Sequence, residues 1–177
     1  MKKTCSRPLW APWRIEFIKS PKADSCFLCV KGQTDAADAE NLVIARGKGI
    51  YVLVNTYPYN SGHLLISPYR HVPDLADLTP AELTEMMTLT IKAKAVMSLV
   101  MHPDGFNFGF NLGAAAGAGI PGHVHGHLVP RWVGDTNFMP VIGDTRVVPQ
   151  ALQATAEMLR QAWGRHPARG ASDRSSE

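Results

Sequence analysis

The sequence lacks the long apolar run of a membrane span and lacks a cysteine framework. No apolar run approaches the roughly 18 residues that a transmembrane helix needs. Lys2 and Lys3 begin the chain as they begin many signal peptides, but no apolar segment follows them. Three cysteines are too few, and odd in number, for a disulfide scaffold. We therefore expect a cytoplasmic protein that makes no contact with a membrane.

Long runs of one charge are also missing. The formal net charge is only +3, and 19% of the 177 residues are charged. A basic tail or patch of the kind that binds nucleic acid is not indicated, so we expect no nucleic-acid partner. Mild basicity suits a protein that binds small anionic ligands. The length predicts one domain, and a hydrophobic content of 45% is enough for a core.

Hydrophobic periodicity predicts an α+β fold. Short β-type runs predict about five strands in a mostly antiparallel sheet, at residues 42–46, 50–55, 63–68, 106–113 and 123–132. A long central helix is predicted over 79–101, with Thr79 as N-cap, Pro80 in the first turn and Glu82 completing a capping box. A C-terminal helix is predicted over about 149–163, and we expect the helices to cover one face of the sheet.

The domain plan follows from composition. Residues 1–24 are rich in Pro, Trp and Arg, and we expect an irregular arm that packs through Trp10, Trp13 and Phe17. Residues 25–163 form a single domain. The polar tail, residues 164–177, is expected to be disordered.

Three of the seven histidines stand at alternate positions, at His123, His125 and His127. On a strand they line one face, while the residues between them point to the other. Metal binding and nucleophilic or acid–base catalysis both use such a row, whereas core packing does not require it. Exposed histidines on an edge strand remain an alternative.

A loop of small residues, 114–122 (AAAGAGIPG), precedes the histidines. The chain has neither a P-loop motif nor a dinucleotide-binding glycine motif. Backbone N–H groups in a glycine-rich loop can still approach phosphate oxygens, although a plain flexible connection would look the same. The loop and the histidine row together favour attack on phosphorus, with a covalent histidine intermediate.

The stretch HVHGHLVPRW (123–132) resembles the His-x-His-x-His motif of the histidine triad (HIT) superfamily of nucleotide hydrolases and transferases. Residues 55–79 resemble the family's P-x-x-x-G-H-x-L-x-x-P segment. Residues 9–18 and 130–150 resemble the branch that contains the diadenosine tetraphosphate phosphorylases. The resemblance covers about residues 9–163 and implies a HIT-like fold.

The resemblance also implies a mechanism. His125 attacks the α-phosphorus of an AMP-linked substrate, such as diadenosine tetraphosphate, and water or inorganic phosphate then takes the nucleotide. His127 contacts the phosphate and handles the proton, and His123 supports the site. The implied nucleotide-binding residues are Asn55 for the ribose, and Asn111, Gly117, Ala118 and Gly119 for the phosphates. Adenine nucleotides are the implied partners, a homodimer is expected because relatives are commonly dimers, and no organic cofactor is expected.

Some positions depart from the family pattern. Gly126 stands where relatives often carry a bulky residue. Ala118, Gly119 and Gly122 stand where the phosphorylase branch tends to have a Gly-Ser pair and an acidic residue. The acceptor, water or phosphate, therefore stays open. Other open functions are an AMP-binding sensor, an adenosine phosphoramidate hydrolase, and a zinc-stabilised interaction protein whose triad is only a metal cluster.

Cys26 and Cys29 form a C-x-x-C pair. A thioredoxin-like site needs a βαβ context with a helix starting at the first cysteine, whereas an irregular segment is predicted here. Half of a structural zinc site and two small buried thiols are the other interpretations. The resemblance implies zinc bound by Cys26, Cys29, His71 and His123, in a structural role that leaves the chemistry to His125 and His127.

Overall fold

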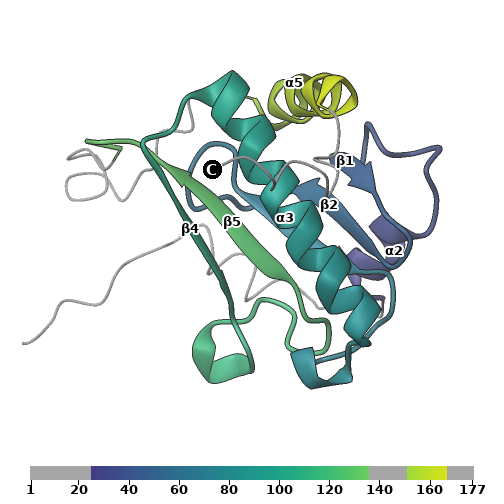
Figure 1. Cartoon of the computed structure of the whole chain (residues 1–177). Helices are drawn as coiled ribbons and strands as arrows, with labels where there is room; N and C mark the ends of the chain where they lie inside the picture. The colour runs from purple at the N-terminus through teal and green to yellow at the C-terminus, as the bar shows by residue number, and fades with distance from the viewer. Residues whose placement is uncertain (1–24, 136–150, 167–177) are drawn as a thin grey trace, which may run out of the picture.

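The structure is a computed structural model that describes residues 25–135 and 151–166. The expected arm at 1–24 lies outside the described residues, as does most of the tail. In the described chain the sheet has five strands in the order β1-β2-β3-β5-β4, with every neighbouring pair antiparallel. The strands are β1 (Val43–Arg46), β2 (Ile50–Val54), β3 (Leu64–Pro68), β4 (Gly105–Phe110) and β5 (Gly126–Arg131). The α+β prediction is therefore confirmed (Figure 1).

The long helix α3 (Pro80–Met101) begins as the sequence predicts. The Thr79 side chain accepts a hydrogen bond from the Glu82 backbone N–H, and the Glu82 carboxylate accepts one from the Thr79 backbone N–H. Two N–H groups of the first turn, which have no partner inside a helix, are thereby satisfied. The helix ends at His102, which adopts the left-handed conformation with φ 48°.

α3 and the last helix, α5 (Leu152–Arg165), share one core with the sheet. Met86 and Met97 of α3 pack in this core with Leu159 of α5. The side chains of β2 that face these helices alternate with side chains that face the other way, as the pleat of a strand requires.

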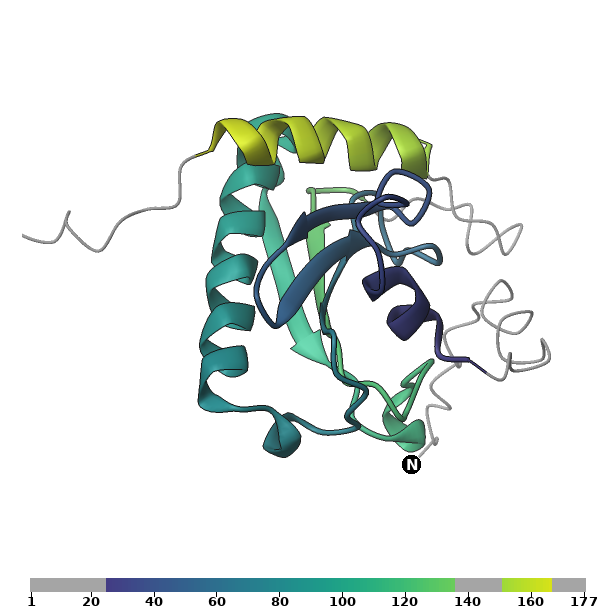
Figure 2. The ribbon, with the colours of Figure 1, turned by 90° about the vertical axis from the view of Figure 1, so that its right-hand side faces the viewer.

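The expectation that helices cover only one face is wrong. A short helix, α2 (Phe27–Gly32), packs on the opposite face through Leu28, which contacts Tyr51 and Leu53 (Figure 2). The predicted irregular segment around the cysteines is therefore helical, with Cys26 at its N-cap. Two interactions stabilise this short helix. Tyr51 Oη donates a hydrogen bond of 2.6 Å to the Leu28 carbonyl, and the Leu28 side chain is buried among apolar partners.

The fifth strand begins later than the sequence predicts, at Gly126 instead of residue 123. Ladder pairing with β3 stops at Ile66 and Gly126. Farther along β3 stands Pro68, which has no backbone N–H to donate to the next rung. The segment before Gly126 stays beside the sheet through a bond of 2.7 Å from the Val124 N–H to the Val72 carbonyl. In the described chain no helix is long and apolar enough to cross a membrane.

Candidate active site

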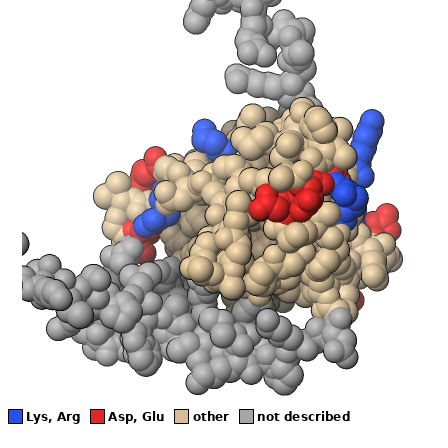
Figure 3. All heavy atoms as spheres, turned by 90° about the horizontal axis from the view of Figure 1, so that it is seen from below, with Lys and Arg blue, Asp and Glu red and all other residues tan. Residues whose placement is uncertain are grey.

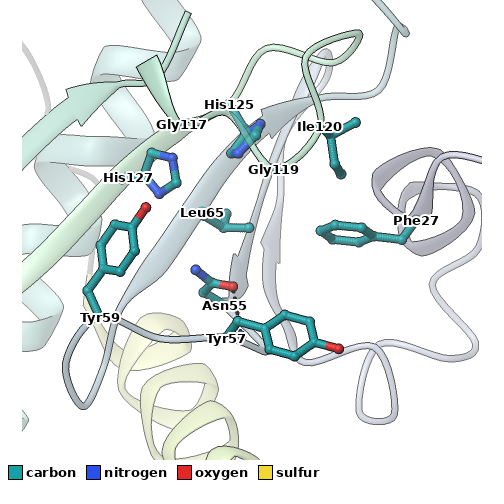
Figure 4. A pocket seen from close by; sticks show the side chains of 10 residues that line it. All are labelled: Phe27, Asn55, Tyr57, Tyr59, Leu65, Gly117, Gly119, Ile120, His125 and His127. Carbon is teal, nitrogen blue, oxygen red and sulfur yellow. Dashed lines mark hydrogen bonds between the residues drawn. The ribbon is translucent and has the colours of Figure 1, made fainter. Parts of the chain in front are cut away.

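A pocket opens on the face of the sheet opposite α3, where β3 and β5 meet the glycine-rich loop (Figure 4). Aromatic and aliphatic side chains form one end, and two histidines of the triad lie toward the other end. Its lining residues are Phe27, Asn55, Tyr57, Tyr59, Leu65, Gly117, Gly119, Ile120, His125 and His127. An apolar pocket with a few convergent polar groups is the usual form of a small-molecule site.

His125 is held in one tautomer. Its Nδ1 lies 2.7 Å from the backbone carbonyl oxygen of His123, and a carbonyl oxygen only accepts, so Nδ1 carries the proton. Nε2 therefore carries the lone pair, on a ring that lines the pocket. Burial lowers the pKa of His125, and the hydrogen bond to His123 partly offsets this effect. A neutral imidazole with an available Nε2 is a nucleophile.

The tautomer of His127 is set by His63. The Tyr59 backbone N–H donates to His63 Nδ1 at 3.0 Å, so a neutral His63 carries its proton on Nε2. That Nε2 lies 3.0 Å from Nδ1 of His127 and donates to it. His127 consequently carries its own proton on Nε2, from which it can be given to a substrate oxygen. His63 both braces its turn and contacts the triad.

Two asparagines from the expected set adjoin these histidines. Asn55 Oδ1 accepts from the Tyr57 N–H at 2.9 Å, and its Nδ2 lies 3.2 Å from His63 Nδ1. The second N–H of this amide and the second lone pair of its oxygen can still bind hydroxyl groups. Asn111 Nδ2 lies 3.4 Å from His127 Nε2; both are donors in the tautomer that the shorter contacts of His63 set, so Asn111 adjoins the histidine end without a hydrogen bond to this nitrogen.

The glycine-rich loop reaches the pocket at Gly117 and Gly119, but not at Ala118. Gly117 has φ 82°, a conformation that glycine adopts without strain. Its N–H donates to the Ala114 carbonyl at 3.0 Å, and the Ala118 N–H donates to the Gly113 carbonyl at 3.4 Å. Of the three expected phosphate contacts in this loop, Gly119 is therefore the residue best placed to offer its N–H.

The described part of the loop face carries few charged side chains (Figure 3). Lysines and arginines stand there at separate places and form no continuous basic surface among the described residues. Since the described residues that line the pocket include no lysine or arginine, a phosphate there would meet histidine and backbone N–H groups.

The four predicted metal ligands lie together. The ligand atoms of Cys26, Cys29, His71 and His123 are all within 4.8 Å of one another. His123 Nε2 donates to the Pro68 carbonyl at 2.9 Å, so its Nδ1 lone pair faces the two sulfur atoms at 3.3 and 3.4 Å. At metal sites a backbone carbonyl commonly accepts from the other ring nitrogen of a ligating histidine and so fixes its tautomer. The donor set, two thiols and two imidazoles within 4.8 Å of one another, is of the kind that binds a zinc ion.

Electrostatics within the cluster agree with this description. Burial lowers the pKa of His123, the hydrogen bond to the Pro68 carbonyl partly offsets this, and the neighbouring His71 and His125 lower it further, which favours the neutral ring. Burial raises the pKa of the Cys29 thiol, and Cys26 adds to the effect. A bound cation would reverse this second shift, because the ligand is the thiolate.

Two of the departures from the family pattern have a packing reason. A Cβ atom on Gly122 would lie 3.1 Å from His71 Nε2, so glycine leaves room for the His71 ring. A Cβ atom on Gly126 would lie 3.1 Å from the Phe108 ring and 3.2 Å from the Phe110 ring. These rings pack edge to face with centroids 5.4 Å apart and occupy the space that a bulkier residue would need.

Sequence reasoning did not identify the residues that form the apolar end of the pocket or stack on its histidines. Phe27 stands between the paired cysteines, and Tyr57 and Tyr59 follow Asn55 at alternate positions. The aromatic alternation after Asn55 was the available signal, but it lies in a turn segment with no periodic element. The other two lining residues that were missed are Leu65 and Ile120.

The fold and this site define a family. Residues 36–133 match the HIT domain, and the chain belongs to this family. The chain is 44% identical, over 166 residues, to a protein of Mycobacterium tuberculosis named AP-4-A phosphorylase, with 90% of this chain and 85% of that protein covered. It is 41% identical over 93 residues to the asymmetrical bis(5'-nucleosyl)-tetraphosphatase of Schizosaccharomyces pombe, with 52% of this chain and 50% of that protein covered.

Solved structures agree with the fold. A Zn-bound histidine triad family protein from Mycobacterium smegmatis superposes with a TM-score of 0.64 at 27% sequence identity. The match covers 80% of this chain and 94% of that chain. A HIT-like five-stranded antiparallel sheet with a long helix and a C-terminal helix is thereby confirmed.

Proposed function

We propose that the chain is a nucleotidyl hydrolase or phosphorylase that cleaves dinucleoside polyphosphates, such as diadenosine tetraphosphate, through a covalent nucleotidyl-histidine on His125. The observation that carries the proposal is the 2.7 Å bond between His125 Nδ1 and the His123 carbonyl, which leaves the Nε2 lone pair for attack. The names of the relatives, AP-4-A phosphorylase and bis(5'-nucleosyl)-tetraphosphatase, support the substrate class.

The first step transfers AMP to the protein. His125 Nε2 forms a bond to the α-phosphorus, the bond from phosphorus to the bridging oxygen breaks, and the leaving polyphosphate receives a proton from His127 Nε2. In the second step water or inorganic phosphate attacks the same phosphorus, gives its proton to His127, and the N–P bond breaks. Diadenosine tetraphosphate then yields ATP together with AMP from water, or ATP together with ADP from phosphate.

The surrounding groups lower the barrier by holding charge in place. The Gly119 N–H and the protonated Nε2 of His127 are donors for the non-bridging oxygens and the leaving oxygen. In comparable sites a fixed hydrogen-bond donor at a developing oxyanion lowers the activation free energy by about 3–4 kcal/mol. Asn55 holds the ribose, and the apolar end at Phe27 and Ile120 takes the base.

We extend the proposal to a structural zinc ion held by Cys26, Cys29, His71 and His123. When bound, it joins α2 to the segment before β5 and takes no part in the reaction. The residues of the chain itself orient the nucleophile. The His123 ring is fixed by its bond to the Pro68 carbonyl, and the His123 backbone carbonyl accepts the hydrogen bond that orients the His125 ring. A thiolate pair of this kind requires a reducing compartment, which supports a cytoplasmic location.

A homodimer is part of the same proposal. The outer face of α3 exposes Met87, Ile91 and Leu99, with 46%, 64% and 59% of their surface accessible. β4 forms the end of the sheet in the described chain and exposes Phe108 nearby. Apolar surface on a helix and an edge strand favours burial against a second copy. Light scattering should give twice the chain mass for the wild type and the single-chain mass for Ile91→Glu.

The experiment that tests the function is a product assay with diadenosine tetraphosphate, with and without inorganic phosphate, resolved by chromatography. ATP plus AMP in the absence of phosphate identifies water as the acceptor. ATP plus ADP, only when phosphate is present, identifies phosphorolysis. No turnover in either reaction contradicts the proposal and favours an AMP-binding sensor or an adenosine phosphoramidate hydrolase.

A further inference from the structure

The hydroxyl of Tyr59 lies at the histidine end of the pocket, and the reaction proposed above gives it no role. Asn111 Nδ2 donates to Tyr59 Oη at 3.4 Å and lies at the same distance from His127 Nε2. Figure 4 shows the Tyr59 hydroxyl pointing toward His127. A phenol, an amide and an imidazole thus converge on one end of the site.

The Tyr59 ring stacks on His63 and on His127, the two histidines whose hydrogen bond places the proton of His127 on Nε2. It stacks on His63 with centroids 4.6 Å apart and on His127 with centroids 5.7 Å apart. Its backbone N–H is fixed as well, because it donates to His63 Nδ1. The hydroxyl is therefore preorganised, and a phenol both donates and accepts hydrogen bonds.

The position along the substrate follows from the order of groups in the pocket. Phe27 and Ile120 lie at one end, Asn55 and His125 in the middle, and His127 with Tyr59 at the other (Figure 4). A base at the apolar end and a ribose at Asn55 bring the α-phosphorus to His125. The next phosphate along the chain then lies on the side of Tyr59, beyond the oxygen that His127 protonates.

We propose that the Tyr59 hydroxyl binds the phosphate group next to the one that His125 attacks, the β-phosphate of a bound adenine nucleotide. This assignment rests on the proposed function. It supplies a hydroxyl at the phosphate end, where the loop contributes Gly117 and Gly119, which have no side chain. Because the acceptor enters where the leaving group departs, an incoming inorganic phosphate meets the same hydroxyl.

The test compares two ligands that differ in one phosphate. Binding of AMP and of ADP is measured by calorimetry in a His125→Asn background, which cannot form the covalent adduct. Adding Tyr59→Phe keeps the ring and removes only the hydroxyl. We expect the Kd for ADP to rise about tenfold, with the Kd for AMP changed less than about twofold, as for one lost hydrogen bond to a charged group.

Tyr57→Phe in the same background is the matched control. Tyr57 lines the same pocket, but its hydroxyl points away from both histidines (Figure 4). The ratio of the ADP and AMP affinities should therefore stay that of the parent. Circular dichroism of each variant checks that the fold is retained.

Each other outcome overturns the assignment. Equal loss of AMP and ADP affinity in Tyr59→Phe shows a structural role exerted through His127. Unchanged affinities show that the hydroxyl touches neither ligand, and equal affinity of the parent for both ligands shows that no group binds the β-phosphate. If the parent binds neither AMP nor ADP, the proposed function fails, and this assignment fails with it.

Discussion

The backbone carbonyl oxygen of His123 accepts a hydrogen bond of 2.7 Å from Nδ1 of His125. The ring of His123 belongs to the cluster with Cys26 and Cys29, and its backbone orients the proposed nucleophile. One residue thus joins the candidate metal site to the candidate catalytic site. The alternation of the triad has a structural consequence: the first histidine supports the second, and the third adjoins His63.

His63→Asn should slow the reaction without abolishing binding. The substitution removes the Nε2–H that donates to His127 Nδ1 at 3.0 Å, so His127 no longer has one fixed tautomer. We expect kcat to fall about 10–100-fold, with a much smaller change in KM, as for a misplaced general acid. Steady-state kinetics with diadenosine tetraphosphate measure both. His102→Asn, at the exposed left-handed end of α3, is the control, and an equal effect of the two variants would contradict the account.

Metal content should depend on the cluster and not on the nucleophile. Wild type and His125→Ala are expected to carry one zinc ion per chain, whereas Cys26→Ser and His71→Ala should carry almost none. Cys5→Ser controls for the loss of a thiol. Atomic emission measurements on the purified proteins check this. Metal loss in His125→Ala would instead support the interpretation of the triad as a metal cluster.

Gly126→Ala should destabilise the fold by about 1–2 kcal/mol, because the added Cβ would lie only 3.1 and 3.2 Å from the Phe108 and Phe110 rings, which must then shift. Gly109→Ala, on the neighbouring strand and paired with His127, is the matched control, since its Cβ would meet nothing within 4 Å. Urea unfolding of both variants provides the comparison. Equal stability of Gly126→Ala and wild type would show that the two rings leave this space free.

Acid should weaken the start of α3. Arg70, together with the Thr79 cap, lowers the pKa of Glu82 from 4.5 to about 2. A lowered pKa in the folded state stabilises the protein above the unfolded value, and this stabilisation is lost as the pH falls from about 4.5 to about 2. Arg70 is half-exposed, so we expect only about 1 kcal/mol.

Glu82→Gln should therefore lower the free energy of unfolding at neutral pH and reduce its fall toward pH 2. Urea unfolding at a series of pH values measures this. Glu40→Gln, at an exposed position, controls for the loss of one negative charge. The same pH dependence in Glu82→Gln and wild type would contradict the assignment.

Local signals predicted the parts of the fold that local interactions determine. The capping box at Thr79 and Glu82 is formed within four residues, and it is present as predicted. The spacing of the triad predicted that its three histidines lie on one face of a strand; His125 and His127 do line one pocket, although the strand begins only at Gly126. These features depend on neighbours in the sequence, which a sequence displays directly.

What the sequence did not predict depends on distant partners. α2 is six residues long and is stabilised by packing on Tyr51, not by its own propensity. The start of β5 depends on Pro68 in another strand. Tyr59 meets His127 only because β3 and β5 are neighbours, and no local pattern marks that contact.

The covalent step at His125 is tested most directly by rapid quenching of the reaction with diadenosine tetraphosphate, followed by intact-mass analysis of the protein. The wild type should gain the mass of one adenylyl group, which peptide mapping places on His125. His125→Ala should gain none while still binding AMP. A turnover-competent wild type without an adduct, or an adduct that survives in His125→Ala, would contradict the account.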